Sequence, residues 1–197
     1  MALRRFPSLL VETPRLTVRP LCADDDKRVA EIFADRLVRR WLPVAQDELE
    51  EFDGYAWCTE LAVERRDSGA GDHYGIVRRE DERLVGCLWT KNTDWLTRST
   101  EIAYAVAADA RGYGVAPEAV DVLALSLLLE HRFQRVELRV APGNVASRRV
   151  AEKAGFTYEG LLRNAGSLAS GRVDLEAGRC CRPTSVELTA RGCRGAR

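Results

Sequence analysis

The chain has 197 residues, of which 46% are hydrophobic and 30% charged, a composition typical of a folded domain with its own core. Thirty basic and thirty acidic residues give a net charge of +0, which argues against nucleic-acid binding and lends no support to an anionic membrane as partner. Six dispersed cysteines without a Cys-x-x-Cys pair, and only two histidines far apart, predict buried thiols in a reducing cytoplasm rather than a disulfide framework or a metal site.

Strand and helix patterns alternate from Leu16 onward. Residues 16–20 alternate between apolar and polar types and end at a proline, which predicts a strand. The acidic run at residues 24–26 predicts the start of a helix, and a second helix is predicted from Asp47 to Arg66, with Leu61 and Val63 among its inner positions. Three strands are predicted next, the first two as an antiparallel hairpin: His73–Arg78, Arg83–Lys91 and Thr100–Val106.

The strongest helical pattern lies in the second half of the chain. Its apolar positions recur at helical spacing: Ala116, Val120, Leu123, Ala124, Leu127 and Leu128. A strand at 135–140, a helix at 145–154 and a strand at 156–162 follow, whereas beyond Gly166 only 184–189 has a strand pattern. The order β-α-α-β-β-β-loop-α-β-α-β predicts an α/β (α+β) fold whose late strand–helix–strand crossover is right-handed.

The loop Arg111-Gly112-Tyr113-Gly114, between a strand and the long helix, is the most informative segment. Its glycines let backbone amides converge on one point, and the helix start adds unpaired amides and a positive dipole end. These features predict a phosphate or pyrophosphate site in which Arg111 adds a mobile charge. The alternative is a tight connection whose glycines serve geometry alone. A P-loop is absent, and Pro117 occupies the third glycine position of a dinucleotide fingerprint.

Three sequence blocks accompany this loop in order: the opening Glu12–Leu21, the strand Thr100–Val106, and the run Leu138–Phe156 with its continuation to Arg163. The succession from Thr13 to Asn164 resembles the GNAT (GCN5-related N-acetyltransferase) superfamily, in particular its RimJ/RimL-like ribosomal-protein branch. The resemblance implies a mixed, mostly antiparallel sheet of six to seven strands, splayed between the fourth and fifth, with helices on both faces. It also implies a single domain over residues 13–190, an N-terminal extension over 1–12 and a flexible tail over 191–197.

The resemblance further implies acetyl-CoA as co-substrate and no metal. The pyrophosphate of acetyl-CoA would bind the loop, and its pantetheine arm would pair with the splayed strand. Asn144 would bind the pantetheine near the thioester. The implied cofactor-binding residues are Tyr104, Ala105, Val106, Arg111, Gly112, Tyr113, Gly114, Val115, Ala116, Asn144 and Ser147. Ser147 matches a position that can protonate the departing thiolate. For Asn144 and Ser147, helix capping is the alternative or an additional role.

Acetyl transfer needs a neutral amine, and the reference pKa is about 7.7–8.0 for an α-amine but about 10.4 for lysine. A mild base therefore suffices for an N-terminus, and Glu101 is the candidate by resemblance. The alternative is a strand glutamate paired with an arginine. Relatives often carry a further acid soon after the segment matching Leu162-Arg163-Asn164, whereas the first carboxylate here is Asp174.

The function expected from this resemblance is acetyl-CoA-dependent N-acetyl transfer in a ternary complex, to a peptide or protein N-terminus or a small-molecule amine. Two alternatives stay open: a non-catalytic acyl-CoA-binding regulatory module, and an aminoglycoside, amino-acid or antibiotic acetyltransferase. A homodimer is compatible with the resemblance.

Two further expectations concern aromatic side chains. The four tryptophans line the acceptor pocket or pack in the core, and His73 and His131 lie at the surface or at strand ends.

Overall fold

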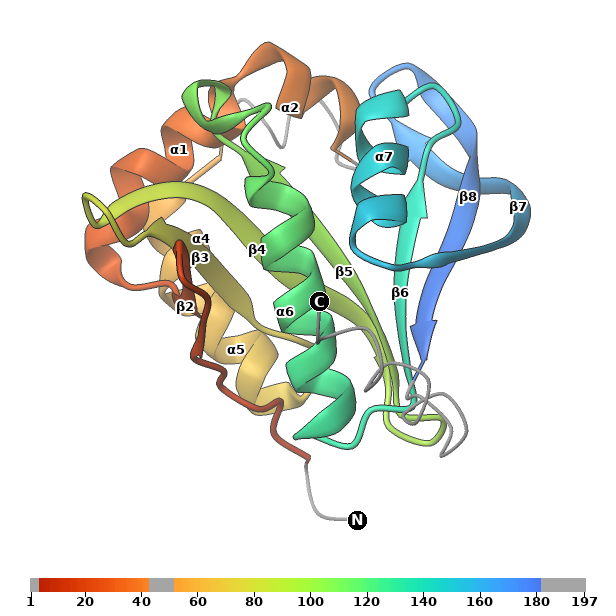
Figure 1. The fold of residues 1–197 in the computed structure, drawn as a ribbon, viewed down its shortest axis with the longest axis horizontal. Helices are drawn as coiled ribbons and strands as arrows, with labels where there is room; N and C mark the ends of the chain where they lie inside the picture. The colour runs from red at the N-terminus through yellow and green to blue at the C-terminus, as the bar shows by residue number, and fades with distance from the viewer. Residues whose placement is uncertain (1–3, 43–51, 182–197) are drawn as a thin grey trace, which may run out of the picture.

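The structure, a computed structural model, describes residues 4–42 and 52–181. The strands within these ranges are β1 (Val11–Glu12), β2 (Leu16–Pro20), β3 (His73–Arg78), β4 (Arg83–Asp94), β5 (Ser99–Val106), β6 (Arg135–Val140), β7 (Thr157–Leu168) and β8 (Gly171–Cys181). They form one sheet in the order β1-β2-β3-β4-β5-β6-β8-β7 (Figure 1). Neighbours pair antiparallel except β5 and β6, which are parallel, so the expected mixed, mostly antiparallel sheet is confirmed. In the described ranges it has eight strands rather than the expected six to seven.

Helices cover both faces of this sheet. The α-helices are α1 (Asp26–Ala34), α2 (Arg36–Trp41), α4 (Gly54–Cys58), α5 (Glu60–Ser68), α6 (Val115–Leu129) and α7 (Val145–Lys153), and the short 3-10 turns are η1 (Ala23–Asp25) and η2 (Ala108–Ala110). In Figure 1, α6 and α7 lie in front of the sheet, and α4 and α5 lie behind it. All six predicted apolar positions of α6 are buried, as the helical spacing indicated.

The sheet splits between β5 and β6. Ser99, Thr100 and Glu101 pair with residues 135–137, and the pairing then ends although both strands continue. This is the expected opening between the fourth and fifth predicted strands. Since α6 connects β5 to β6, its first turn lies at the end of the sheet where these two strands diverge (Figure 1). The split therefore opens next to a helix N-terminus.

Several sequence expectations are corrected. The predicted second helix is interrupted: part of it lies outside the described residues, and Thr59 separates α4 from α5. Leu61 and Val63 are exposed rather than inward-facing. The chain after Gly166 completes the long hairpin of β7 and β8. This segment is rich in glycine and arginine, and it lacks the apolar–polar alternation that predicts a strand. The predicted strand at 184–189 lies outside the described residues.

His73 lies at a strand end, one of the two positions expected for it, and is 2% exposed. It begins β3, stacks on Trp57 with ring centroids 4.0 Å apart, and its Nδ1 is 2.9 Å from the Trp57 carbonyl oxygen. Burial lowers its pKa to about 4, so the imidazole is neutral at neutral pH. A neutral ring can stack in an apolar layer without a charged partner.

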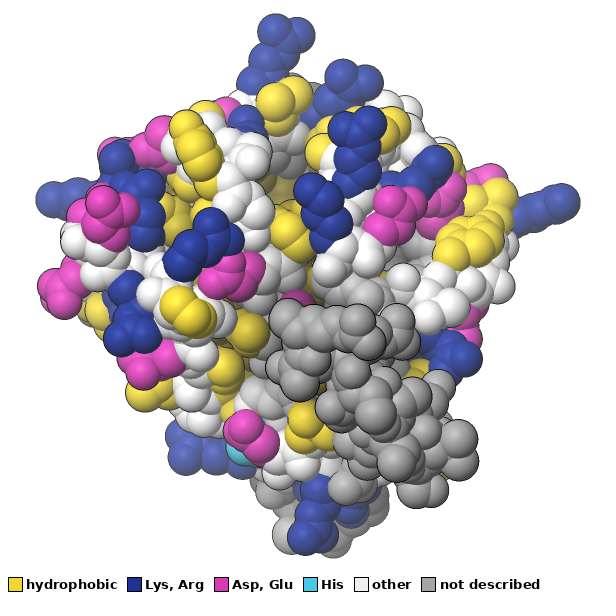
Figure 2. All heavy atoms as spheres, viewed as in Figure 1, with side chains coloured by type: hydrophobic (Ala, Val, Ile, Leu, Met, Phe, Trp, Pro, Cys, Tyr) yellow, Lys and Arg dark blue, Asp and Glu magenta, His cyan; other side chains and the backbone are white. Residues whose placement is uncertain are grey.

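The segment before Thr13 takes part in the core. Phe6 and Leu9 are 1% and 3% exposed, and the Phe6 ring contacts Trp95 and Phe133. In the view of Figure 2, basic and acidic side chains are interspersed, as the balanced charge suggests. Within the described ranges, no helix combines the length and apolar character that crossing a bilayer requires.

Candidate active site

A cavity of about 650 Å³ occupies the split in the sheet. It runs from the loop before α6 to Glu101 at the last paired position of β5, and the walls come from α2, β4, β5, β6, α7 and the β7–β8 hairpin. Its volume lies in the range of small-molecule and cofactor sites. A long ligand entering at the loop would therefore end beside Glu101.

The loop at one end has the geometry of an anion cradle. Gly112 and Gly114 have φ of +86° and +78°, and Gly114 is the N-cap of α6. A Cβ at Gly112 would meet no heavy atom within 4 Å, so it would project into open space. The backbone conformation, and not crowding within the protein, is what requires glycine there. The first turn of a helix has amides without an intrahelical partner, and Val115 and Ala116 of this turn line the cavity.

Arg111 does not supply the mobile charge expected of it. Its Nε donates to the Val106 carbonyl oxygen at 3.2 Å, and its Nη2 donates to Asp35 Oδ1 at 2.5 Å. Asp35 is itself the N-cap of α2, where it accepts from the amides of residues 37 and 38. The Arg111 guanidinium lowers the pKa of this carboxyl group. Arg111 therefore ties the loop to α2.

The cations that sequence reasoning missed lie on α7. Arg149 and Lys153, one helical turn apart, line the cavity together with the first turn of α6, and neither has an ion-pair partner among the described residues. Their neighbour Arg148 is different, because it pairs with Glu176 at 2.7 Å and does not line the cavity. In the sequence these two residues belong to a basic stretch, which is a signal that does not distinguish a ligand contact from a solvated helix face.

The exposed edge of β5 runs along the cavity. Residues 102–106 pair with β4 on one side and have no strand partner on the side of β6 within the described chain. Backbone amides and carbonyls at such an edge need partners, and an extended ligand with amide groups can supply them. Tyr104, Ala105 and Val106 all line the cavity, as expected of cofactor-binding positions.

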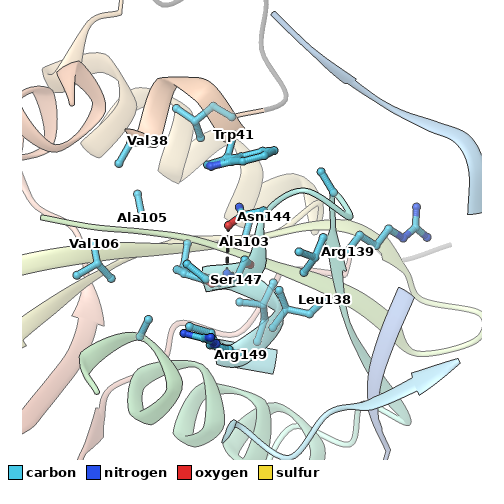
Figure 3. A pocket seen from close by; sticks show the side chains of 18 of the residues that line it. Val38, Trp41, Ala103, Ala105, Val106, Leu138, Arg139, Asn144, Ser147 and Arg149 are labelled. Atoms are coloured by element: carbon cyan, nitrogen blue, oxygen red, sulfur yellow. Dashed lines mark hydrogen bonds between the residues drawn. The ribbon is translucent and has the colours of Figure 1, made fainter. Parts of the chain in front are cut away.

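Asn144 and Ser147 lie at the start of α7, on the opposite wall. Asn144 is the N-cap, and its Oδ1 accepts from the Ser147 amide at 3.1 Å (Figure 3). Capping uses the amide oxygen and leaves the Asn144 Nδ2 group without a hydrogen-bond partner in the described chain. Ser147 Oγ accepts from the Tyr104 hydroxyl at 2.8 Å. Capping and ligand contact are thus compatible at both residues.

Glu101 marks the other end of the cavity and is 4% exposed. Lys91 Nζ lies 3.1 Å from its Oε1, while Asn92 Nδ2 donates to Oε2 at 2.9 Å and Arg139 Nε lies 3.5 Å from the same oxygen. Asn92 is at an irregularity in β4 that turns its side chain toward the carboxylate. A carboxylate accepts about four hydrogen bonds, so three neighbours leave room for one more.

Apolar side chains form much of the remaining cavity wall. Leu37, Val38 and Trp41 come from α2, and Figure 3 shows Val38 and Trp41 directed from α2 toward the cavity. A Cβ at Gly143 would lie 3.2 Å from Trp41 Cη2, so the indole packs on the turn before Asn144. The hairpin contributes the facing wall: Gly166, Ser167, Leu168, Val173 and Leu175.

Most, but not all, of the expected site residues meet here. Trp41 and Trp89 line the cavity, whereas Trp57 and Trp95 pack against the core. Tyr113 is 72% exposed and does not line the cavity. Asp174 does not line it either, and its Oδ1 accepts from the Asn164 amide at 2.7 Å. The remaining predicted residues all contribute to the lining: Glu101, Tyr104, Ala105, Val106, Arg111, Gly112, Gly114, Val115, Ala116, Asn144 and Ser147.

The split sheet, the glycine loop at a helix start and the elongated cavity together define an acyl-CoA-binding acetyltransferase fold. The family model described as "Acetyltransferase (GNAT) domain" matches residues 15–157. The chain therefore belongs to the GNAT acetyltransferase family, and the resemblance expected from its sequence is confirmed.

Individual relatives agree with this assignment. The chain is 30% identical over 156 residues to a putative ribosomal N-acetyltransferase, YdaF, of Bacillus subtilis, a match that covers 76% of this chain and 81% of the relative. The structure of Mycobacterium smegmatis RimJ in complex with CoA-disulfide superposes with a TM-score of 0.77 at 26% identity, covering 90% of this chain and 89% of that one. Ribosomal-protein-S5-alanine acetyltransferase of Vibrio fischeri shares the fold, with a TM-score of 0.75 at 18% identity and coverage of 88% and 97%.

The protein is an N-acetyltransferase that uses acetyl-CoA. The residues present fit this co-substrate, because the cavity offers a glycine loop at a helix start, a strand edge for an extended amide-bearing arm and two cations, the edge and the cations having no partner in the described part of the chain. The anion cradle and the polar end at Glu101 lie at opposite ends of the same cavity. Phosphates and thioester can thus be bound at the same time.

Proposed function

We propose that the acceptor is the α-amine of a peptide or protein N-terminus, and that acetyl transfer is direct, with both substrates bound. The observation that carries this proposal is the charge of the cavity: its lining holds five cationic side chains and one carboxylate, Glu101, within the described residues. Arg111 is paired with Asp35, and Arg149 and Lys153 are assigned to phosphate below, so the charge that an acceptor meets is the charge around Glu101. Two of those cations, Lys91 and Arg139, already neighbour Glu101.

This charge balance discriminates between amines. A polyamine or an aminoglycoside carries several positive charges, and bringing it among these cations is unfavourable. An N-terminal peptide brings one amine, and its pKa of about 7.7–8.0 leaves a useful neutral fraction at pH 7. A lysine side chain, with a pKa of about 10.4, needs a stronger base than a carboxylate with one open acceptor position.

The proposed role of Glu101 is to orient the acceptor amine or the water that receives its proton. Its carboxylate has an open acceptor position facing the cavity, and Lys91 and Asn92 fix its two oxygens. Ser147, across the cavity, is proposed to donate its hydroxyl hydrogen to the departing sulfur. Acetyl-CoA supplies the acetyl group as an activated thioester. The two residues approach the reacting centre from β5 and from α7.

The cofactor-binding roles are proposed from the same lining. Backbone amides of the loop and of the first turn of α6 would hold the pyrophosphate, and Asn144 Nδ2 would donate to the pantetheine arm. Arg149 and Lys153 would neutralise phosphate charge, since Arg111 is already paired with Asp35. A cytoplasmic location is part of the proposal, because Cys58 and Cys87 are buried as thiols, which suits a reducing compartment.

Thiol release from acetyl-CoA, measured against a panel of amines, tests the acceptor. Short peptides with free N-termini should give turnover. Four other compounds should give rates at least about tenfold lower: the same peptides with formylated N-termini, spermidine, an aminoglycoside, and lysine whose α-amine is acetylated. Turnover that is fastest with a polycation would overturn the acceptor proposal. CoA binding in calorimetry without turnover on any amine would instead favour an acyl-CoA-binding regulatory module.

A further inference from the structure

Among the residues that the structure describes, one hydrogen bond between side chains bridges the split in the sheet. Tyr104 on β5 donates its hydroxyl hydrogen to Ser147 Oγ on α7, with 2.8 Å between the oxygens. The two residues are 43 positions apart in sequence, and both line the cavity. The bond therefore joins the wall formed by the unpaired strand edge to the wall that carries the proposed hydroxyl donor.

The direction of this bond determines where the serine hydrogen points. Burial raises the Tyr104 pKa to about 12, so the phenol keeps its proton at neutral pH. A hydroxyl that accepts one hydrogen bond still has its own hydrogen to donate. The Ser147 hydrogen has no acceptor among the described residues, and the serine faces the cavity.

The serine is held at its backbone as well. The Asn144 side chain accepts from the Ser147 amide, which fixes the first turn of α7. The Tyr104 bond then restricts the remaining freedom, namely rotation of the Ser147 hydroxyl. An isolated serine hydroxyl samples several rotamers, and restricting it to one pays the orientation cost in advance.

We propose that Tyr104 is a positioning residue: by donating to Ser147 Oγ, its hydroxyl aims the serine hydrogen at the sulfur that departs from the thioester. This inference rests on the proposed function. In the transfer, the amine nitrogen forms a bond to the acetyl carbon, and the carbon–sulfur bond breaks with its electron pair passing to sulfur. The amine releases one proton to water, and the thiolate leaves while accepting the Ser147 hydrogen bond. Tyr104 keeps its proton throughout.

A purely structural brace is the competing explanation of the same bond. A brace would act on the stability of the split or on the binding of both substrates. A positioning residue acts on the turnover rate through Ser147 and through no other group. The two explanations therefore differ in a double-mutant cycle, because residues that act as one unit are not additive.

The experiment compares wild type, Tyr104→Phe, Ser147→Ala and the double variant, each with acetyl-CoA and the best peptide acceptor. Tyr104→Phe should lower kcat by roughly tenfold, with the KM for acetyl-CoA and the Tm nearly unchanged. The double variant should be no slower than Ser147→Ala alone. Tyr74→Phe is the matched control, since Tyr74 is a buried tyrosine whose hydroxyl donates to the Pro7 carbonyl oxygen and neither residue lines the cavity. It should lower Tm and leave kcat unchanged.

Each result has a defined meaning. A wild-type kcat in Tyr104→Phe, or a double variant slower than Ser147→Ala by the full Tyr104→Phe factor, overturns the positioning role while the acetyltransferase reaction stands. Loss of folding in Tyr104→Phe also overturns it, because the bond would then be a brace. Absence of wild-type turnover on every amine, seen before any variant is made, would defeat the proposed function together with this inference.

Discussion

Glu101 and Glu137 face each other in register on β5 and β6, yet only one of them lines the cavity. Glu137 is bonded to Arg135 at 2.6 Å and to Arg139 at 3.0 Å, and these arginines lower its pKa. Glu101 retains an open acceptor position toward the cavity. Two carboxylates at the same level of the sheet therefore have different surroundings, which makes each the control for the other.

Glu101→Gln removes the carboxylate charge while it keeps the shape and one acceptor oxygen. We expect kcat to fall about 100-fold, in the range of general acid–base contributions, with the Kd of CoA changed by less than about twofold. Steady-state kinetics with a peptide acceptor and calorimetry with CoA measure the two quantities. Glu137→Gln should reduce kcat far less. Equal rates in wild type and Glu101→Gln would remove Glu101 from the mechanism.

Arg149 and Lys153 allow a test of phosphate recognition at the residue scale. Replacing both by alanine should raise the KM for acetyl-CoA about fivefold at low salt, since an exposed charge pair contributes about 0.2–1 kcal/mol. The effect should shrink as salt rises and should vanish with acetyl-pantetheine, which has no nucleotide phosphates. Arg148→Ala is the control, because Arg148 is paired with Glu176 outside the lining. An equal KM increase with acetyl-pantetheine would contradict phosphate contact.

At the scale of elements, one glycine of the loop before α6 has both an unusual backbone conformation and a position in the cavity lining. Gly112 needs a positive φ, and it lines the cavity. Gly155 also has a positive φ, +76°, and open space around a Cβ, but it does not line the cavity. Substitutions at these two glycines therefore distinguish the effect of backbone strain on stability from the effect of a lost ligand contact on binding.

Gly112→Ala and Gly155→Ala should each lower the free energy of unfolding by about 1 kcal/mol, the cost of a left-handed conformation for a residue with a Cβ. Only Gly112→Ala should weaken CoA binding, by about tenfold, which corresponds to losing one charge-assisted hydrogen bond. Urea denaturation and calorimetry measure both effects. CoA affinity that is equal in the two variants would count against the cradle.

How far the sequence predicts each element depends on which physical signal carries it. The strands of the first sheet half and α6 were predictable because one face of each is apolar and the spacing is regular. The long strand β8 was not predicted, since it is held by backbone pairing to β6 and β7 and by ion pairs such as Arg179 with Glu159. Its half-exposed residues carry no alternation of apolar and polar types.

The candidate site divides in the same way. The loop, Glu101, Asn144 and Ser147 were found because motif spacing marks them and their resemblance to a family gives them roles. Asn92 was missed, because an irregularity in β4 sets its orientation toward Glu101 and no spacing rule encodes it. The Tyr104 side chain was missed too. Its partner is 43 residues away, and only the folded arrangement brings the two hydroxyl groups together.

At the scale of the whole molecule, the buried His73 makes stability depend on pH. Its pKa is lowered from 6.5 to about 4 by burial, so the unfolded chain binds a proton that the folded chain does not. Stability is therefore full above pH 6.5 and is lost as pH falls toward 4. Between pH 7.5 and 5.5 the free energy of unfolding should decrease by about 1.4 kcal/mol from this residue.

Urea denaturation of His73→Asn at the two pH values checks this expectation. The variant should be less stable at pH 7.5, because a stacked buried ring is lost, but its stability should change less between the two pH values than that of wild type. His131→Asn is the control, since the His131 side chain is 31% exposed and lies outside the core. A wild-type pH dependence retained in His73→Asn would assign the effect to other groups.

The parallel pairing of β5 with β6 determines which stretch of the chain forms which part of the cavity. Parallel neighbours need a crossover, so α6 begins where the strands part, and one continuous stretch, residues 101–153, supplies the phosphate cradle, the strand edge and the α7 cap. α2 and the β7–β8 hairpin lie outside this stretch and supply further parts of the cavity wall. The shape of the cavity can consequently diverge through substitutions in these two segments while the stretch that carries the loop, the strand edge and the start of α7 stays the same.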